Sequence, residues 1–455
     1  MKLRTLTLEN FRGFKHFKCE FHENLNVLVG LNGFGKTSLL DAISVAYGQF
    51  MSGFGTSIDR GIHIKEVHLA KVSTAPVTME YQVPSVVGAS CYPSSIPDFP
   101  ESWSRQKNST KKNSRTTQVK ELKNAAYTLQ KMVQEGANVA LPLIAFYGTD
   151  RLGEHEFEPS GARREQPELA KSSRLEGYKD WFRPKSSYET FSNWLYLETL
   201  ASSERNMEID ELRTQGVSLV PGNIHNEHLR ALREALDTVL EPAGWSNVRY
   251  SPNQKRHIAT HTTQGDMPLA LLSDGVRNVV GMVADIAHRA IRLNPFLGRH
   301  AVKETEGLVL IDEVDMHLHP QWQRVIASNL SKAFPKIQFI VTSHSPHIIG
   351  ELKPSQVVLL RQDEHGVVSA SNPAQSFGLS SDTVLNEIMR DRHVSSQITR
   401  NKEVEAELER IFELIDEEDK EQAEIAIAAL EEKLQGEIPE LLRAKLSLDF
   451  DEWSD

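Results

Sequence analysis

The chain has 455 residues and a formal net charge of −11 at pH 7, and its hydrophobic (39%) and charged (25%) fractions are those of an ordinary soluble globular protein. Two cysteines are too few for a disulfide framework or a cysteine-rich metal cluster, and no apolar run is long enough to cross a membrane. We therefore expect a cytoplasmic protein with no membrane partner and with more than one subdomain.

The negative charge is concentrated near the end of the chain. Residues 401–455 contain 19 acidic and 6 basic residues, a net charge of −13. The rest of the chain has a net charge of +2, so its body is close to neutral. The composition therefore neither excludes nor supports a nucleic-acid partner.

The N-terminal segment is expected to form two strands around a turn. Residues 2–9 and 16–21 have strand character, and the turn between them is Asn-Phe-Arg-Gly-Phe, residues 10–14. A third strand, residues 25–29, leads into a glycine-rich segment. This order places that segment at the end of a strand.

The glycine-rich segment has the features of a phosphate-binding loop. Its spacing from Gly30 is Gly-x-x-x-x-Gly-Lys-Thr, and it opens a helix expected to run to about residue 49. Successive N–H groups of such a loop point into one hollow, and the helix N-terminus adds its positive dipole end. We expect Lys36 to reach the β and γ phosphates of a nucleotide, and the Thr37 hydroxyl to bind Mg²⁺. The predicted nucleotide-binding residues of this segment are Asn32, Gly33, Gly35, Lys36, Thr37 and Ser38.

The middle of the chain is harder to interpret. Residues 64–83 alternate as in a sheet, whereas residues 85–140 are polar, with seven basic residues and one acidic residue between positions 103 and 124. We interpret 85–140 as a basic polar insertion that is partly disordered. A contact for nucleic acid or for an acidic partner is the alternative, and the sequence does not separate the two.

A buried strand and a helical lid are expected next. The apolar run 141–148 ends in a polar corner, residues 149–151, which we expect to face the nucleotide. Apolar residues recur at helical spacing over 188–200 and 227–240. These helices predict a lid subdomain.

A second helix N-terminus is predicted far from the phosphate-binding loop. Ser273 or Asp274 is expected to cap a helix over 276–293 by accepting its first free N–H groups. One nucleotide does not need two such termini on separate segments. Two chains arranged head to tail would need them, with Ser273, Asp274 and Gly275 of one chain reaching the γ-phosphate held by the other. We therefore predict a homodimer or a higher homo-oligomer.

Two later strands end in polar residues suited to hydrolysis. The apolar run 307–311 leads directly into Asp312 and Glu313, and the run 337–342 is followed by His344. Ligands of open α/β sheets bind at the carboxyl ends of strands. We expect Asp312 to hold Mg²⁺, Glu313 to polarise the attacking water and His344 to contact the γ-phosphate.

Strands that alternate with helices predict an α/β fold with a mixed, largely parallel sheet. The acidic C-terminal helices are amphipathic, and their apolar faces must pack either on the core of the same chain or on a partner or second copy. The expected domains are the N-terminal part of the ATPase core (1–84), the insertion (85–140), the lid with one core strand (141–260), the C-terminal part of the core (261–375) and the acidic helical region (376–455).

Three motifs carry a resemblance to a known superfamily. Residues 272–277, Leu-Ser-Asp-Gly-Val-Arg, resemble the ABC signature, and residues 313–320 resemble the D-loop region of RecF/SMC-like ATPases, with Asp315 as the D-loop acid. Residues 10–14 resemble their N-terminal motif, in which the arginine, here Arg12, contacts nucleotide phosphates. The chain is similar to ABC-type ATPases of the RecF/SMC/OLD-like superfamily without coiled-coil arms. The resemblance implies an SMC/RecF-like head, ATP and Mg²⁺ as cofactors, and ATP hydrolysis.

Residues 143–151 and 376–392 are most similar to the PtuA-like ATPases of Septu-type antiphage systems, also found beside retrons. This implies an ATPase without nuclease activity of its own that senses or regulates, and assembles with, a separate PtuB-like HNH nuclease and reaches DNA only through that complex. One alternative is a RecF/SMC-like repair ATPase that clamps duplex DNA. Another is an OLD-type ATPase-nuclease, which needs a Toprim domain, whereas only about 110 mostly helical residues follow His344.

Overall fold

The chain folds into two compact units, Met1–Val384 and Leu385–Asp455. The computed structural model describes residues 1–55, 59–74, 77–111, 115–149, 173–182, 187–217, 222–389, 402–417, 419–434, 436 and 438–450. In this part of the chain no helix is long and apolar enough to cross a membrane.

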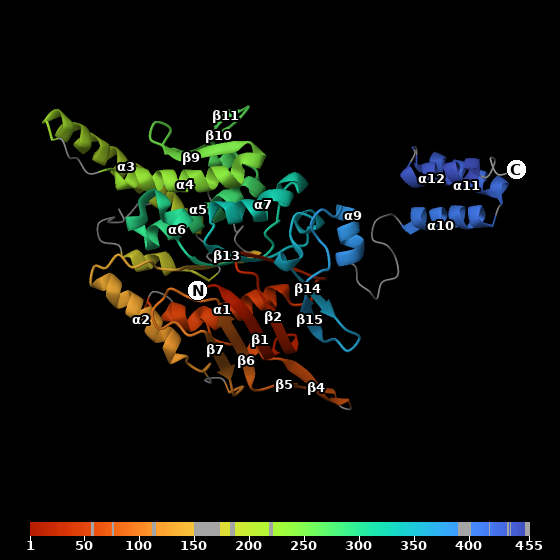
Figure 1. Ribbon diagram of the computed structural model, residues 1–455, viewed down its shortest axis with the longest axis horizontal. Helices are drawn as coiled ribbons and strands as arrows, with labels where there is room; N and C mark the ends of the chain where they lie inside the picture. Colours follow the sequence, from red (N-terminus) through yellow and green to blue (C-terminus); the bar gives the residue numbers. More distant parts are fainter. Residues whose placement is uncertain are drawn as a thin grey trace. The chain divides into compact units, whose positions relative to one another are not determined.

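The core of the first unit is a six-stranded sheet in the order β15-β14-β3-β13-β12-β8 (Figure 1). Its first five strands in chain order pair in parallel, and only the edge strand β15 is antiparallel. Every residue of β3, β8, β12 and β13 is buried, as expected for apolar runs covered on both faces. The predicted α/β fold with a mixed, mostly parallel sheet is confirmed. The strands are β3 (Leu25–Val29), β8 (Leu143–Tyr147), β12 (Gly307–Ile311), β13 (Ile337–Thr342), β14 (Val357–Gln362) and β15 (Val368–Ser371).

A second, antiparallel sheet lies against the opposite side of helix α1 (Lys36–Ser52), which contacts strands of both sheets and is buried over most of its length. Helices α5 (Asp274–Leu293) and α7 (Pro320–Ala333) cover the other face of the six-stranded sheet (Figure 1). The strands of the second sheet, in the order β2-β1-β6-β7, are β1 (Leu3–Phe11), β2 (Phe14–Glu20), β6 (Ser85–Cys91) and β7 (Ser102–Lys107).

Residues 85–107, which the composition led us to expect in a polar insertion, therefore supply two strands of this sheet. The side chain of Arg105 is fully buried, because it pairs with Asp59 at 2.9 Å and donates to the Val45 and Arg60 carbonyls, each at 2.8 Å. Lys107 is buried as well. Two of the seven basic side chains are thus structural. Helix α2 (Lys120–Gln134) continues this stretch and packs on α1.

The remaining elements of the first unit form a helical subdomain, a small sheet, a hairpin and short connections. Helices α3 and α4 fall where helical spacing predicted them, and both pack on α5. The helices are α3 (Ser187–Thr214), α4 (Ile224–Leu240), α5 (Asp274–Leu293), α6 (Ala301–Glu304), α7 (Pro320–Ala333), α8 (Pro346–Ile349) and α9 (Ser381–Thr383), with shorter turns η1 (Ile64–Glu66), η4 (Arg174–Tyr178), η5 (Glu241–Ala243), η6 (Leu269–Leu271), η7 (Pro295–His300), η8 (Pro354–Gln356) and η9 (Val384–Ile388). The strands are β4 (Leu69–Thr74), β5 (Val77–Tyr81), β9 (Trp245–Ser251), β10 (Arg256–His261) and β11 (Gly265–Pro268).

The second unit is a bundle of three helices, α10 (Lys402–Asp416), α11 (Lys420–Leu434) and α12 (Pro439–Phe450). Their apolar residues form one buried cluster that includes Ile411, Ala423 and Leu441. The apolar faces thus pack on one another, so the bundle has a hydrophobic core of its own. The sequence analysis considered the core of the same chain and a partner or second copy, but not packing of these helices on one another.

His288 in α5 makes the stability of the first unit sensitive to acid. Burial, together with the positive charges of Arg292 and Arg289, lowers its pKa to about 3. Between about pH 6.5 and pH 3 the unfolded chain therefore carries a proton on this residue and the folded chain does not. The free energy of unfolding consequently decreases as the pH is lowered through that window. We expect His288 to account for a loss of about 2 kcal/mol between pH 7 and pH 5.

Urea unfolding at the two pH values tests this expectation. The His288→Gln variant should lose less stability than the parent chain over that interval. The exposed His365→Gln variant is the matched control and should behave like the parent. Equal losses in the His288→Gln variant and the parent would rule out this role for His288.

Candidate functional site

The glycine-rich loop between β3 and α1 has the backbone of a phosphate-binding loop. Gly33 and Gly35 have φ values of 87° and 88°, a left-handed conformation that favours glycine. Gly35 is the residue that precedes α1, and no side chain caps this helix. The free N–H groups at its start therefore remain available for an anion.

Lys36 is held inside this loop. Its Nζ donates to the carbonyls of Gly30 at 2.8 Å and Leu31 at 3.1 Å. Burial lowers its pKa, although the charges of Asp312 and Glu313 oppose the shift. An ammonium that is only partly desolvated and bonded to neutral carbonyls would gain from the stronger, charge-assisted bonds that phosphate oxygens offer.

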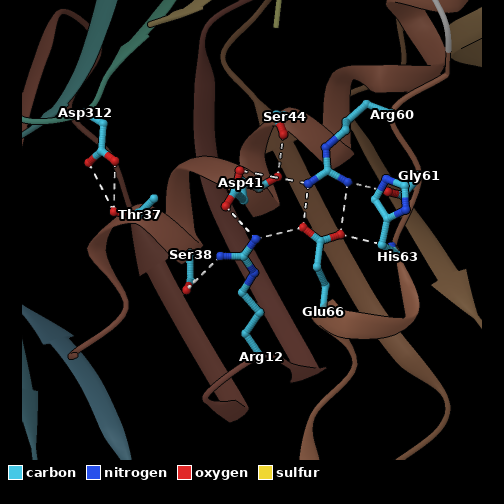
Figure 2. Close-up of polar contacts among 10 residues, drawn as sticks. All are labelled: Arg12, Thr37, Ser38, Asp41, Ser44, Arg60, Gly61, His63, Glu66 and Asp312. Atoms are coloured by element: carbon cyan, nitrogen blue, oxygen red, sulfur yellow. Dashed lines mark hydrogen bonds and ion pairs between the residues drawn. The ribbon is translucent and has the colours of Figure 1, made fainter. Parts of the chain in front are cut away.

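The end of β12 lies directly against the start of α1. The Thr37 hydroxyl donates to Asp312 Oδ2 at 2.9 Å, and the hydroxyl of Thr342 donates to Asp312 Oδ1 at 2.7 Å (Figure 2 shows the Thr37 contact). A hydroxyl and a carboxylate are hard oxygen donors of the kind that Mg²⁺ prefers. Thr37 and Asp312 thus fit a magnesium ion, and their role as its ligands stays a prediction.

Glu313 and His344 are placed at the same sheet edge by the parallel register. Ile311 pairs with Val341 and Tyr147, so the residues that follow these three strands emerge together. Glu313 has a φ of 50°, and its N–H donates to the Thr342 hydroxyl at 2.7 Å, which fixes a sharp turn just after Asp312.

Burial and the positive charge of Lys36 lower the pKa of His344, against the opposing effect of the nearby carboxylates Asp315, Glu313 and Asp312. His344 is therefore neutral at pH 7 and can donate one hydrogen bond without adding a positive charge. The charges of Lys36 and Glu313 thus both act on the His344 ring at this edge.

Arg12 lies beside α1, but it is paired with acids. Its Nη2 contacts Asp41 at 2.7 Å and Glu66 at 3.0 Å, while Nη1 lies 3.5 Å from the Ser38 hydroxyl (Figure 2). Arg60 also binds Glu66, at 2.5 Å. Burial would raise the pKa of Glu66, but the hydrogen bonds and charge of Arg60 hold it below its ordinary value. Glu66 therefore stays ionised and anchors both guanidinium groups.

The turn that carries Arg12 also packs on the phosphate-binding loop. The ring of Phe14 lies so close to Gly35 that any Cβ at Gly35 would collide with it. The distance of 3.5 Å from Arg12 to Ser38 places its guanidinium next to the first turn of α1. The 10–14 turn and the loop are thus one structural unit.

The start of α5 differs from the expected capped terminus. Ser273 precedes α5 with no side-chain cap hydrogen bond, and Asp274 is instead paired with Arg277. The prediction that Ser273 or Asp274 caps this helix is therefore wrong. A Cβ at Gly275 would collide with the His317 carbonyl, which explains the glycine. Ser273 and Asp274 are exposed to solvent.

Two sequence profiles of known families match overlapping parts of the chain. One, described as "AAA domain", matches residues 5–217, and another, described as "AAA domain, putative AbiEii toxin, Type IV TA system", matches residues 138–350. The matched ranges include the phosphate-binding loop and the ends of β12 and β13. The chain is related to AAA-type ATPases over residues 5–350.

Two ATPases of defence systems and one SMC head domain are similar to this chain over most of its length. The "Retron Vc95 probable ATPase" of Vibrio cholerae serotype O1 biovar El Tor is 24% identical over 85% of this chain and 78% of its own. The "Septu protein PtuA" of Bacillus thuringiensis is 23% identical over 86% of this chain and 83% of its own. The SMC head domain from Thermotoga maritima covers 82% of this chain and 99% of its own at 13% identity and a TM-score of 0.42. The distant relationship to retron and Septu ATPases, inferred from the sequence, is confirmed.

Most predicted site residues of the chain meet at one place. The phosphate-binding loop, Asp312, Glu313 and His344 lie at the carboxyl ends of β3, β12 and β13. The Ser273 side chain makes no hydrogen bond to them among the described residues. Asn32 is exposed on the loop. Of the polar corner 149–151, residues 150 and 151 lie outside the described residues. The roles assigned to individual residues stay predictions.

Three contributors were missed from the sequence. Thr342 orients both Asp312 and Glu313, and its signal was a polar residue that ends a buried strand. Asp41 pairs with Arg12 and was signalled by an acid within an otherwise apolar helix. Glu66 lies in a short turn with no pattern that could have identified it.

Proposed function

We propose that this AAA ATPase binds ATP with Mg²⁺, hydrolyses it in composite sites between two copies of the chain, and regulates a separate HNH nuclease in antiphage defence. The observation that carries the hydrolytic part is the arrangement of Thr37, Asp312, Glu313 and His344 around one phosphate-binding loop. The regulatory part is supported by the relationship to retron and Septu ATPases. In this proposal the protein acts in the cytoplasm, where ATP is available.

The phosphate-binding loop and the adjoining strand end account for binding of the nucleotide. Lys36 exchanges its carbonyl partners for β and γ phosphate oxygens, and the N–H groups at the start of α1 bind the same oxygens. Thr37 and Asp312 would hold Mg²⁺, which neutralises charge on the phosphates when bound. Arg12 leaves part of its contact with Asp41 and Glu66 to reach a phosphate.

Glu313 and His344 account for hydrolysis. Glu313, on the sharp turn that follows Asp312, is assigned the role of general base, whose carboxylate accepts a proton from the attacking water. His344 is neutral, so it can donate a hydrogen bond to the γ-phosphate. Because the His344 ring carries no charge, it does not repel the ammonium of Lys36.

The composite site is supported by polar groups at two places that have no hydrogen-bond partner among the described residues. The first turn of α5 has free N–H groups, and the exposed Ser273 that precedes them makes no capping hydrogen bond. In addition, Asp315 Oδ1 is buried without a hydrogen-bond partner among the described residues. A second chain placed head to tail would bring a phosphate to the α5 terminus and a polar group to Asp315.

The Ser273→Arg variant tests this arrangement. A bulky cation at the start of α5 is unfavourable beside the helix dipole and obstructs a phosphate that another chain presents. We expect ATP hydrolysis to fall at least about 100-fold, by analogy with loss of one stabilising donor group. ATP affinity of the separate chain should remain within about threefold, because one chain's own loop binds the nucleotide. Ser203→Arg, an exposed change on α3, is the matched control.

Steady-state hydrolysis and fluorescent-ATP binding measure the two quantities. Loss of binding together with hydrolysis in Ser273→Arg would place Ser273 in the binding site of its own chain. Unchanged hydrolysis would remove Ser273 from the site altogether.

The nuclease partner is tested by co-purification from the native host. Tagged full-length chain and a chain ending at residue 384, which lacks the separate C-terminal unit, are compared. We expect a small HNH protein to accompany the full-length chain and to cleave DNA only in that complex, because we assign the ATPase no nuclease activity of its own. Retention on duplex DNA without any protein partner would favour the repair-type clamp, for which the burial of Arg105 and Lys107 leaves less basic surface.

A further inference from the structure

A cluster of one carboxylate and two imidazoles joins α3 to α4, on elements that supply none of the residues of the ATP site. Glu198 belongs to α3, whereas His225 and His228 lie three residues apart in the first turns of α4. Residues three apart on a helix project from the same face, so both rings can reach one neighbour. The three side chains offer ligand atoms that lie within 4.8 Å of one another.

The geometry of the cluster is convergent. Both imidazoles direct Nδ1 at the same oxygen, Glu198 Oε1, at 3.1 Å from His225 and 2.7 Å from His228. The Glu198 and His228 side chains are only 4% and 8% exposed, whereas His225 is 32% exposed. Two of the three ligand side chains are therefore buried, and His225 leaves the cluster accessible to solvent.

The contact on the far side of His228 restricts its protonation state. Its Nε2 lies 3.0 Å from the Pro295 carbonyl, which can only accept, so Nε2 must carry a hydrogen. Neutral His228 then presents a bare Nδ1 lone pair to a carboxylate oxygen at 2.7 Å, which is repulsive. A cation must therefore lie between Nδ1 and Glu198. It is either a second proton on His228 or a metal ion.

We infer that Glu198, His225 and His228 form a binding site for a divalent transition-metal ion of the zinc class. Two imidazole nitrogens and one carboxylate oxygen are a donor set that zinc accepts, with bonds of about 2.0–2.2 Å. Ligand atoms around a tetrahedral ion with such bonds lie roughly 3.3 Å apart, so the distances of 3.1 and 2.7 Å from the two Nδ1 atoms to Glu198 Oε1 require only small movements.

Two features fit a metal ion. Both imidazoles direct Nδ1 at one carboxylate oxygen, as two nitrogen ligands of one ion do; without an ion, His225 would be a neutral Nδ1–H donor to Glu198 and His228 an imidazolium. The Pro295 carbonyl is also the kind of outer partner that fixes the tautomer of a metal-bound histidine. The solvent-exposed side at His225 leaves a position for a water as fourth ligand.

The site would act as a clip in the helical subdomain. Asn223 already joins the start of α4 to α3, because its Nδ2 donates to the Ser202 carbonyl at 2.8 Å. A metal ion a few residues further would fix α4 against α3 and, through His228, against the Pro295 turn before α6. Ion occupancy would thus determine how firmly these three segments are held together.

Metal content of the full-length, untagged chain tests the inference. After dialysis against a chelator, the chain is titrated with Zn²⁺ in competition with a colorimetric chelator, and then with Co²⁺. We expect one tightly bound Zn²⁺ per chain and, with Co²⁺, the visible absorption of a tetrahedral site. The His225→Ala and Glu198→Gln variants should bind at least about 10-fold more weakly. His365→Ala, an exposed histidine elsewhere, should bind like the parent.

The measurement on the parent chain does not depend on the folding of any variant. Absence of stoichiometric Zn²⁺ and of the Co²⁺ absorption in the parent would leave a buried imidazolium–carboxylate pair and overturn the inference. Equal Zn²⁺ affinity of the parent and of a folded His225→Ala variant, with ATP binding as the check of folding, would also overturn it.

Discussion

The Glu313→Gln variant should bind ATP as the parent does and hydrolyse it at least about 100-fold more slowly, the contribution expected of a general base. Glutamine keeps the size of the side chain and the backbone contact with Thr342, but it cannot accept a proton from water. Asp312 and Thr37, which we assign to Mg²⁺, are untouched. With the chemical step blocked, the variant should accumulate as an ATP-bound dimer.

Single-turnover hydrolysis and sedimentation velocity with and without ATP measure the two effects. Glu364→Gln, an exposed residue between β14 and β15, is the matched control and should leave both unchanged. A Glu313→Gln chain that hydrolyses ATP at the parent rate would remove Glu313 from its proposed role. A Glu313→Gln chain that hydrolyses ATP slowly but never dimerises would support Glu313 as the general base and contradict the ATP-bound dimer.

The Lys36→Ala variant should lose ATP binding by at least about 100-fold, roughly 2.7 kcal/mol of binding free energy. Charge-assisted bonds from an ammonium to phosphate oxygens are among the stronger polar contacts, and Lys36 lies in a partly desolvated loop. Removal of the charge leaves only backbone N–H groups to bind the phosphates. Hydrolysis should fall below detection.

Isothermal titration with ATP and with a non-hydrolysable analogue measures this loss. Lys71→Ala, an exposed lysine of β4, should bind like the parent. Because Lys36 is bonded to loop carbonyls, thermal unfolding must show that Lys36→Ala remains folded. Undiminished affinity in the folded variant would show that the nucleotide lies elsewhere.

The parts of this protein that could be predicted from sequence are those determined by short segments. Apolar runs such as 307–311 can be stable only as buried strands, and a strand followed at once by Asp312 and Glu313 determines where the carboxylates lie. The phosphate-binding loop is likewise a local pattern of glycines and Lys36. These features required no knowledge of the rest of the fold.

The parts that could not be predicted depend on partners far apart in sequence. Arg105 appeared to be one basic residue of a polar stretch, because the Asp59 and Val45 groups that bury it are about 45–60 residues away. The pairing of Arg12 with Asp41 and Glu66 has the same origin. Ser273 was expected from its residue type to cap α5, yet its side chain is exposed and makes no capping hydrogen bond.

A mixture of the two inactive chains, Lys36→Ala and Ser273→Arg, tests the composite site most directly. In a head-to-tail heterodimer, one site combines intact Lys36 of one chain with intact Ser273 of the other. Random pairing should then restore about a quarter of the parent hydrolysis rate per chain. If the mixture stays as inactive as its components while sedimentation shows that the chains associate with ATP, the two halves of the site do not come from different chains and the account is wrong.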